Sequence, residues 1–578
     1  MAVAADQEQR QKASWRSLTA IVDFAVGSHA RAIAVLLVAS LVSFLPGFFS
    51  TPPIDRDEAR FAQATKQMVE SGDYVDIRFQ DESRYKKPVG IYWLQAGVVK
   101  LGEAAGVPRA HTRIWLYRLV SLAGAIGAVL ATYWAALGFV SRRAALLAGI
   151  MMASSLLLGV EARLAKTDAM LLLTAVVAMG ALGRIYLAAQ AGEGADHAAS
   201  HPWRRPAIFW TALAAGVLLK GPLILMFVGL TIAALVALDR SAAWLMRLKP
   251  AAGIPWMLLL VLPWFVAIVV KSGDSFFTES LGHDLFAKLG SGQESHGGPP
   301  GTYLVLFWLT FFPGAMLAGL AAPAIWRARR EPGAKFLLAW IVPAWILLEI
   351  VATKLPHYVL PLYPAIAILI AGVIDTHALS RRPWLMAGAV WWFVITLGLG
   401  IATVALHITI GQQPGFLAWP FLVAALIFGL FAWWLYQVDG AELSLLRASA
   451  ASILLSWALF GMTFTSLPRL FPANDLSKYV RFTAGCDDPK VATAGYHEPS
   501  LVFLTGTNLK HVSGAEAAEF LKAGGCRFAF IEGRQERSFA QRADALGLRY
   551  AKGTRLDGIN ISGGRPITVT VYRAEGGP

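Results

Sequence analysis

Long apolar stretches dominate the chain and recur along most of its length, separated by short polar connections. A helix needs about 20 apolar residues to cross the hydrocarbon core of a bilayer. By this rule we predict about thirteen spans, so the expected fold class is a polytopic α-helical membrane protein. The predicted spans are 32–50, 119–140, 144–160, 169–189, 206–219, 221–238, 250–270, 301–326, 336–353, 358–374, 383–406, 414–438 and 448–468.

Composition and charge support this class and predict an orientation. The chain is 56% hydrophobic and 15% charged, whereas soluble domains are about 25% charged. Basic residues concentrate in the N-terminal segment 1–31 and in every second loop, a bias that marks the cytoplasmic side. We therefore predict a cytoplasmic N-terminus, an uncleaved first span and, because the number of spans is odd, a C-terminal tail outside. For a bacterial cell this means the inner membrane and the periplasm.

The tail, residues 469–578, is polar and long enough for one small α/β domain. Its patterns predict strands at "VATAGY", "SLVFLTG", "RFAFIEG" and "ITVTVYRA", and helices at "GAEAAEFLKAG" and "SFAQRADALG". Cys486 and Cys526 are the only cysteines of the chain. A periplasmic tail allows a disulfide between them, and two buried free thiols are the alternative.

The outer loop 51–113 begins with an unusual density of charge, "DRDEARFA". The spacing in "DEARFAQATKQMVESGD" predicts an amphipathic helix along the membrane surface, with Asp55, Asp57 and Glu58 at its N-terminus. Helix capping needs one carboxylate, so three indicate a function besides capping. The basic residues of the same loop suit a lipid phosphate, although a solvated surface is the alternative.

Other outer loops, distant in sequence, bring more charged groups to the same membrane face. They hold Glu161, Arg163, Lys166 and Asp168; Lys220; Lys271, His283, Asp284, Lys288 and His296; and Lys354, His357 and Tyr358. Each alone is explained by capping or surface solvation, but together they predict a site at the membrane border. Lysines and arginines there would bind the phosphate of a lipid-linked substrate, and a carboxylate would act as general base.

Several common site motifs are missing from the sequence. It has no GxxxxGK[ST], no GxGxxG that opens a strand–helix unit, and no HExxH or CxxC. We therefore predict no nucleotide site, no cofactor, no metal and no nucleic-acid partner.

The outer-loop motifs, taken in order, resemble a known family. They are "DE", "GDYV", "RYKKPVGIYWLQA", "TDAMLLL", "KGP" and "KLPHYVLPLYP". They are similar to those of the polyprenyl-phosphate-sugar-dependent membrane glycosyltransferases of the C-type (GT-C) fold, which include the lipid A aminoarabinose transferases and the related protein O-mannosyltransferases. The resemblance covers roughly residues 30–470, and "GINISGGR" followed by "ITVTVY" resembles the family's C-terminal domain. It implies a transmembrane glycosyltransferase domain at 32–468 and a periplasmic α/β domain at 469–578.

The resemblance also implies roles for individual residues. Asp57 matches the catalytic aspartate, with Glu58 beside it, and Asp168 matches a second acidic position. The residues expected to bind the carrier phosphate or the substrate are Arg60, Lys86, Lys87, Arg163, Lys166, Lys220, His283, His296, Lys354, His357 and Tyr358. Aminoarabinose-type relatives tend to read "EKP" where this chain reads "KKP". Lys86 thus replaces an acid, and no metal is expected there.

The implied reaction moves one sugar, with inversion, from a polyprenyl phosphate to a periplasmic acceptor. A hydroxyl acceptor needs a base, for which Asp57 is the choice. The expected partners are the polyprenyl-phosphate sugar donor, a glycolipid acceptor such as lipid A, and the bilayer. A protein acceptor is the enzymatic alternative. A lipid or solute transporter is the alternative of another class, but transporters bind substrate near the bilayer midplane, whereas the charge here lies at one border.

Overall fold

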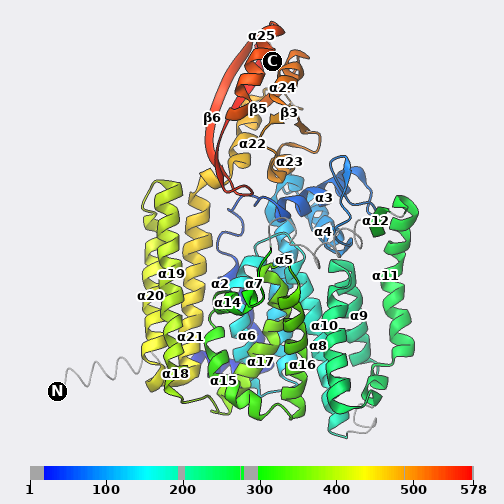
Figure 1. The fold of residues 1–578 in the computed structure, drawn as a ribbon, viewed down its shortest axis with the longest axis vertical. Coiled ribbons are helices and arrows are strands. Elements are labelled where there is room, and N and C mark those ends of the chain that lie inside the picture. The colour runs from blue at the N-terminus through cyan, green and yellow to red at the C-terminus, as the bar shows by residue number, and fades with distance from the viewer. Residues whose placement is uncertain (1–18, 193–201, 274, 279–296, 487, 576–578) are drawn as a thin grey trace, which may run out of the picture.

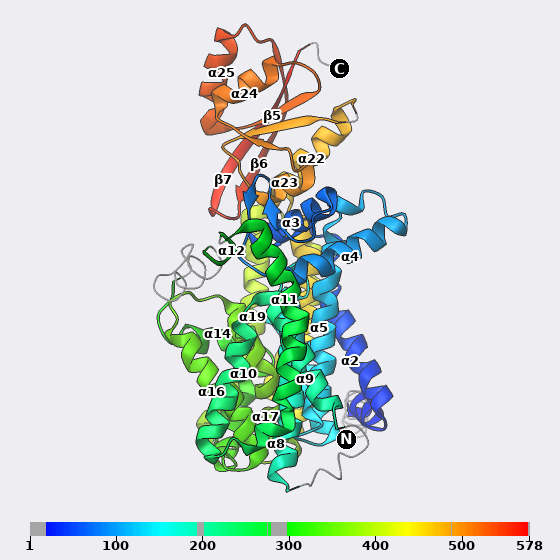
Figure 2. The same cartoon turned by 90° about the vertical axis from the view of Figure 1, so that its right-hand side faces the viewer.

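The computed structural model describes residues 19–192, 202–273, 275–278, 297–486 and 488–575. It consists of a helical bundle with a smaller α/β domain on one end (Figures 1 and 2). The surface helices that follow the first apolar helix lie at that same end, directly beneath the α/β domain (Figure 1). The polytopic helical fold and the small C-terminal α/β domain are thus as predicted.

The helices of the bundle and its loops follow one another along the chain. They are α2 (His29–Phe44), α3 (Asp57–Ser71), α4 (Gly90–Ala104), α5 (Ile114–Ala136), α6 (Arg142–Ala153), α7 (Leu156–Glu161), α8 (Asp168–Gln190), α9 (Arg204–Lys220), α10 (Leu223–Asp239), α11 (Pro250–Ser272), α12 (Ser275–Phe277), α14 (Thr302–Thr310), α15 (Ala315–Arg327), α16 (Pro332–Ile350), α17 (Tyr363–Asp375), α18 (Pro383–Ala387), α19 (Trp391–Leu406), α20 (Trp419–Trp434) and α21 (Tyr436–Ser456). Within the described residues, eight helices are long and apolar enough to cross a membrane, or nine if the bent pair α14–α15 is one span. The number of thirteen spans remains a prediction.

Two of the predicted spans are broken helices. The run 301–326 forms α14 and α15, with a bend of 116° between them, and the run 144–160 is divided into α6 and α7. The two breaks lie against each other: the Leu156 amide donates to the Phe312 carbonyl at 3.2 Å, and the Ser155 hydroxyl donates to the Thr310 carbonyl at 3.2 Å. Irregular backbone persists inside a membrane only where protein groups satisfy it, and these two breaks satisfy each other.

The surface helix α3 begins at Asp57 as predicted but has different surroundings from those expected. Its apolar side packs on α4, where Phe61 lies 5.5 Å from the ring of Tyr92. Its polar side is also covered: Gln63 donates to Thr507 at 2.9 Å and Lys66 donates to the Phe503 carbonyl at 3.2 Å. The helix therefore lies between the bundle and the C-terminal domain, a cover that the spacing of the helix did not predict.

The C-terminal domain is a mixed sheet covered on both faces. Its elements are α22 (Pro472–Thr483), β3 (Lys490–Ala494), α23 (Pro499–Thr505), β4 (Lys510–His511), α24 (Gly514–Lys522), β5 (Arg527–Glu532), α25 (Glu536–Ala545), β6 (Tyr550–Asn560) and β7 (Arg565–Ala574). The strand order is β4-β3-β5-β7-β6, with β3 parallel to β4 and β5, and β7 antiparallel to β5 and β6. Alternation along β5 supplies both cores: Phe528 and Phe530 pack with α22 and α23, whereas Ala529 and Ile531 pack with α24 and α25. A small two-stranded sheet, β1 (Arg78–Phe79) with β2 (Glu82–Ser83), lies in the outer loop.

The predicted strand "SLVFLTG" is wrong, because this segment forms helix α23. A short apolar run fits a buried strand and a buried helix equally well. Pro499 stands at the first turn of α23, and the Asp55 carboxylate of the outer loop accepts a hydrogen bond from the Ser500 amide at 3.0 Å. A cap supplied from so far along the chain is invisible to local patterns.

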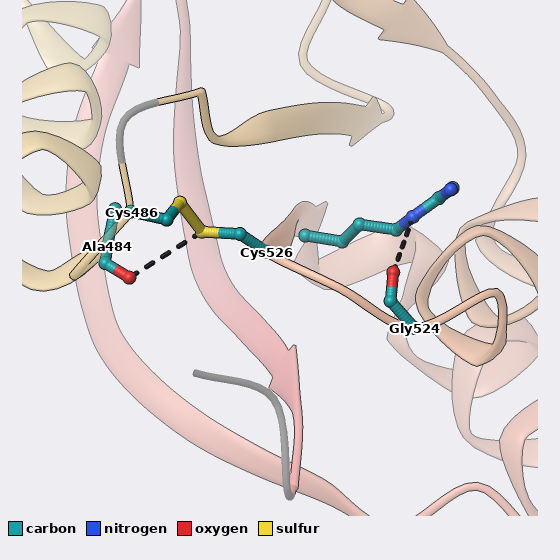
Figure 3. Close-up of a disulfide and its surroundings, with 5 residues drawn as sticks. Ala484, Cys486, Gly524 and Cys526 are labelled. Atoms are coloured by element: carbon teal, nitrogen blue, oxygen red, sulfur yellow. Dashed lines mark hydrogen bonds between the residues drawn. A yellow bond between two sulfur atoms is a disulfide. The ribbon is translucent and has the colours of Figure 1, made fainter.

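Cys486 and Cys526 form a disulfide across 40 positions of sequence, which resolves the two alternatives (Figure 3). The bridge joins the segment after α22 to the start of β5 and lies beside the Ala484 carbonyl. It therefore ties the helix that leaves the bundle to the central strand of the sheet.

Candidate active site

Asp57 occupies the first position of α3, where its side chain is exposed. The residue before it, Arg56, has φ 68° and ψ −116°, a conformation that is strained for a residue other than glycine. The Arg56 guanidinium donates to the Ser562 carbonyl at 2.5 Å, at the tip of the β6–β7 hairpin. The C-terminal domain thus helps to hold the turn that presents Asp57.

Glu58 points away from Asp57 into a buried ion pair. Arg118 of α5 donates to both of its carboxylate oxygens, at 2.7 and 2.8 Å, and each side chain is 1% exposed. The amides of Ile54 and Ala165 donate to the same carboxylate at 2.8 and 2.9 Å. Its oxygens are therefore fully used in joining the outer loop to α5 and to the loop before α8.

A second set of charged side chains forms a buried cluster at the same end of the bundle, which we call the Lys166 cluster. The Lys166 ammonium lies 3.1 Å from Oε1 of Glu161 and 3.8 Å from Oδ2 of Asp168. The Lys220 ammonium donates to Oδ1 of Asp168. His357 lies between the two acids, with Nδ1 3.7 Å from Glu161 and Nε2 3.6 Å from Asp168. The three loops that carry these residues are far apart in sequence, and their convergence is what the charge pattern predicted.

Charge in the cluster is balanced by its members. Burial raises the pKa of Glu161, and the Glu161 Oε2 atom has no hydrogen-bond partner among the described residues. Burial opposes the charged form of Lys166, but Glu161 and Asp168 raise its pKa overall, so the ammonium stays charged. Asp57 adds to this effect, which places it within electrostatic range of the cluster.

Lys87 and Tyr358 border the cluster. The Lys220 ammonium lies 5.2 Å from the centre of the Tyr358 ring, and Lys87 is close enough to His357 to repel its charged form. The turn that carries Lys87 is fixed by the close approach of α4 to α9. A Cβ on Gly90 would lie 2.7 Å from the Leu218 carbonyl oxygen, so the contact requires glycine.

Lys86 points elsewhere, since it is exposed whereas Lys87 is half-buried. Together with Arg60 it lines a cavity of about 290 Å³ between the outer loop and the C-terminal domain, which also receives His497 and His511. Arg60 and Lys86 are therefore brought together, but in a cavity that Lys166 does not line.

Two of the expected site residues lie outside these groupings. Arg163 donates to the Pro46, Gly159 and Ser43 carbonyls and lies over the Phe460 ring. Lys354 donates to the Leu348, Glu349 and Val351 carbonyls at the end of α16. Both cations satisfy backbone carbonyls, as buried charges must. His283 and His296 lie outside the described residues.

Three members of the Lys166 cluster could also hold a metal ion. Glu161, Asp168 and His357 offer ligand atoms that lie within 4.8 Å of one another. Both carboxylates already accept bonds from Lys166 or Lys220, and these ammonium groups compete with a cation for the same oxygens.

Sequence comparison finds one family model and several curated enzymes that this chain resembles. Residues 90–274 match the family model described as dolichyl-phosphate-mannose-protein mannosyltransferase. The chain is 28% identical over 362 residues to an undecaprenyl phosphate-alpha-4-amino-4-deoxy-L-arabinose arabinosyl transferase of Edwardsiella ictaluri, with 59% of each chain covered. An enzyme of the same name from Yersinia pestis is 26% identical over 370 residues, with 61% of each covered. The chain thus spans about three fifths of the length of these curated relatives.

A solved structure extends the likeness over nearly the whole chain. The crystal structure of ArnT from Cupriavidus metallidurans bound to undecaprenyl phosphate superposes with a TM-score of 0.73 at 20% identity, covering 94% of this chain and 98% of that one. The chain has the fold of the C-type membrane glycosyltransferases. This confirms the resemblance inferred from the motifs. The apo form of the same protein gives a TM-score of 0.71.

Arg118 fixes the outer loop beside this site but was not among the residues predicted from the sequence. Arg118 pairs with Glu58 and also donates to the Phe48, Thr51 and Pro52 carbonyls at 3.1, 2.7 and 3.0 Å. Its position one residue before a predicted span was the available signal, because a charge there needs a partner. Asp55, the first acid of the opening stretch, turns out to contact the C-terminal domain.

Proposed function

We propose that this chain is a membrane glycosyltransferase that moves a sugar from a polyprenyl phosphate to an acceptor of the bacterial envelope, at the periplasmic face of the inner membrane. The observation that carries the proposal is the Lys166 cluster with the exposed Asp57 at the same end of the bundle. The likeness to an enzyme solved with undecaprenyl phosphate supports this donor class.

In this proposal the cations beside the cluster hold the carrier phosphate. Lys87 and Lys220 form charge-assisted hydrogen bonds with its oxygens, and Tyr358 forms one wall. Asp168 fixes the ammonium groups of Lys166 and Lys220 in place. The bilayer accommodates the polyprenyl tail.

The chemistry falls to Asp57. An acceptor hydroxyl transfers its proton to the Asp57 carboxylate while its oxygen attacks the anomeric carbon from the face opposite the carrier. The bond between that carbon and the carrier phosphate breaks, and the polyprenyl phosphate leaves as an anion stabilised by the lysines. A phosphate acceptor is already ionised and would need orientation rather than deprotonation. Glu58 is assigned to the support of this loop, since its oxygens are occupied by Arg118.

The acceptor is proposed to be lipid A or another glycolipid. The curated relatives are named as aminoarabinose transferases. A protein hydroxyl is the second candidate, because residues 90–274 match a protein mannosyltransferase model. Transport is disfavoured, since the charged groups gather at one end of the bundle.

The test is a donor-consumption assay with the purified protein in detergent. We expect mass spectrometry to detect release of undecaprenyl phosphate from an undecaprenyl-phosphate-linked sugar when lipid A is added, and much less release with an acceptor peptide. Release with the peptide alone would favour the protein acceptor. Binding of the donor without release under any acceptor, together with unchanged envelope lipids in a deletion strain, would contradict a transferase.

A further inference from the structure

A basic pocket lies where the C-terminal domain meets the start of α5, away from the Lys166 cluster. Arg109 and Arg113 of the outer loop line it from one side, and Lys478 and Arg481 of α22 line it from the other. No carboxylate is among the described residues that line it. The four cations therefore come from two parts of the chain more than 350 positions apart and face one space.

The positive charge of this pocket is poorly compensated among the described residues. Among the described residues Lys478 has one acidic partner, Asp475, at 3.7 Å, and this pair is open to solvent. Such an exposed pair contributes little. Burial lowers the pKa of Arg481, and the charges of Arg109 and Arg113 lower it further. Like charges held together in this way favour a bound anion.

The position and size of the pocket indicate what kind of anion it takes. Phe49 and Trp115 line it with their rings 5.7 Å apart, and Phe49 is 59% exposed. Trp115 stands in the first turn of α5, one of the helices long enough to cross the membrane. Aromatic residues at a helix end mark the headgroup level of a bilayer. The cavity measures about 240 Å³, which is small beside the ~300–1,000 Å³ of typical ligand sites and suits a compact group such as a phosphate.

We propose that this pocket binds the phosphate headgroup of an anionic membrane lipid. Arg109, Arg113 and Arg481 surround the phosphate, while the exposed Phe49 lies against the acyl-chain side. The site does not depend on the transfer reaction, because none of its cations belongs to the Lys166 cluster. It does adjoin the outer loop: Pro52 lines the pocket, and its carbonyl accepts from Arg118, which in turn holds Glu58.

The test is a lipid titration of the full-length protein in a non-ionic detergent. We expect short-chain phosphatidylglycerol to bind about tenfold more tightly than short-chain phosphatidylcholine, whose own ammonium neutralises its phosphate. Arg113→Gln/Arg481→Gln should abolish this preference. The matched control Arg537→Gln/Arg549→Gln removes two exposed arginines of the same domain and should retain it.

If the site variant and the control prefer phosphatidylglycerol over phosphatidylcholine to the same degree, the proposal is overturned. If the double variant fails to fold, the single variant Lys478→Gln, at an exposed position, decides. We expect it to lose about threefold in phosphatidylglycerol affinity. An unchanged affinity would contradict the site. Inorganic phosphate should compete only at millimolar concentration. Competition at the concentration at which the lipid binds would assign the pocket to free phosphate instead and overturn the lipid assignment.

Discussion

Neighbouring carboxylates at the start of α3 have opposite surroundings. Asp57 is exposed, whereas Glu58 is buried against Arg118 and two backbone amides. Removing one partner of a buried ion pair leaves an uncompensated charge, at a cost of about 3–5 kcal/mol. Substitution of Glu58 should therefore reduce stability, whereas substitution of Asp57 should reduce turnover.

We predict that Glu58→Gln lowers the free energy of unfolding by about 3–5 kcal/mol, measured as thermal unfolding in detergent. Glu103→Gln, which changes an exposed glutamate of α4, is the control and should leave the melting temperature unchanged. A Glu58→Gln protein with normal melting but no turnover would instead place Glu58 in the reaction.

The adjacent lysines of "KKP" give a second prediction. Lys87 borders the Lys166 cluster, whereas Lys86 lines the cavity beneath the C-terminal domain. Lys87→Ala should weaken binding of a polyprenyl-phosphate donor by about 1.5–3 kcal/mol, the range for a hydrogen bond to a charged group. Lys86→Ala should weaken it less. Equal and negligible losses in a donor titration would remove Lys87 from the site.

Sequence reasoning at this scale identified the loops that carry charge but not the partner of each charge. Arg163 and Lys354 are basic residues of the outer loops, as are Lys166 and Lys220, yet they satisfy backbone carbonyls. Which carbonyls a helix end leaves open depends on how neighbouring helices break and pack. That information is tertiary, so no local pattern could separate the two groups.

Among the elements, α23 and the outer loop depend on each other. The Asp55 carboxylate accepts from the Ser500 amide at the start of α23, and Glu498 lies nearby. Burial, together with the charge of Glu498, raises the pKa of Asp55 from its ordinary 3.8 to about 7. The folded state thus holds this proton more tightly than the unfolded state does, so its contribution to stability is present at low pH and is lost as pH rises toward 7 and above.

We predict that Asp55→Asn, which cannot ionise, reduces the fall in melting temperature between pH 5 and pH 8. At pH 8 the variant should melt at a higher temperature than the unchanged protein. Asp544→Asn, at an exposed aspartate of α25, is the control and should follow the unchanged protein. If Asp55→Asn keeps the full pH dependence, the carboxyl does not couple α23 to the outer loop.

The elements β5, α23 and α3 show which features a local sequence pattern can predict and which it cannot. The pattern in "RFAFIEG" correctly predicted β5, and the structure shows that this strand fills an apolar core on each face of the sheet. The run "SLVFLTG" fits a buried strand and a buried helix equally well. The carboxylate that caps the helix belongs to Asp55, over 400 positions earlier. The helix α3 was predicted at the correct start, but its burial under the C-terminal domain could not be read from its own spacing.

For the whole molecule, hydropathy and motif order predicted the polytopic helical fold and the small α/β domain. Hydropathy alone did not reveal that two apolar runs are broken helices whose ends satisfy each other. The convergence of distant loops at one end was predicted from topology, and residues of these loops contact one another in the Lys166 cluster. The assembly of this cluster beside Asp57, with the C-terminal domain seated on the same end (Figure 2), is the basis of the proposed reaction.

The most direct test of that reaction is the turnover of Asp57→Asn with an undecaprenyl-phosphate-linked sugar and lipid A, at equal expression. Loss of a general base typically slows a reaction by about 10²–10⁴-fold. We expect a loss of this size, with donor affinity and melting temperature close to those of the unchanged protein, because Asp57 is exposed and its side chain is not part of the buried Arg118 pair. Turnover near that of the unchanged protein would contradict the assignment of Asp57 and, with it, the proposed mechanism.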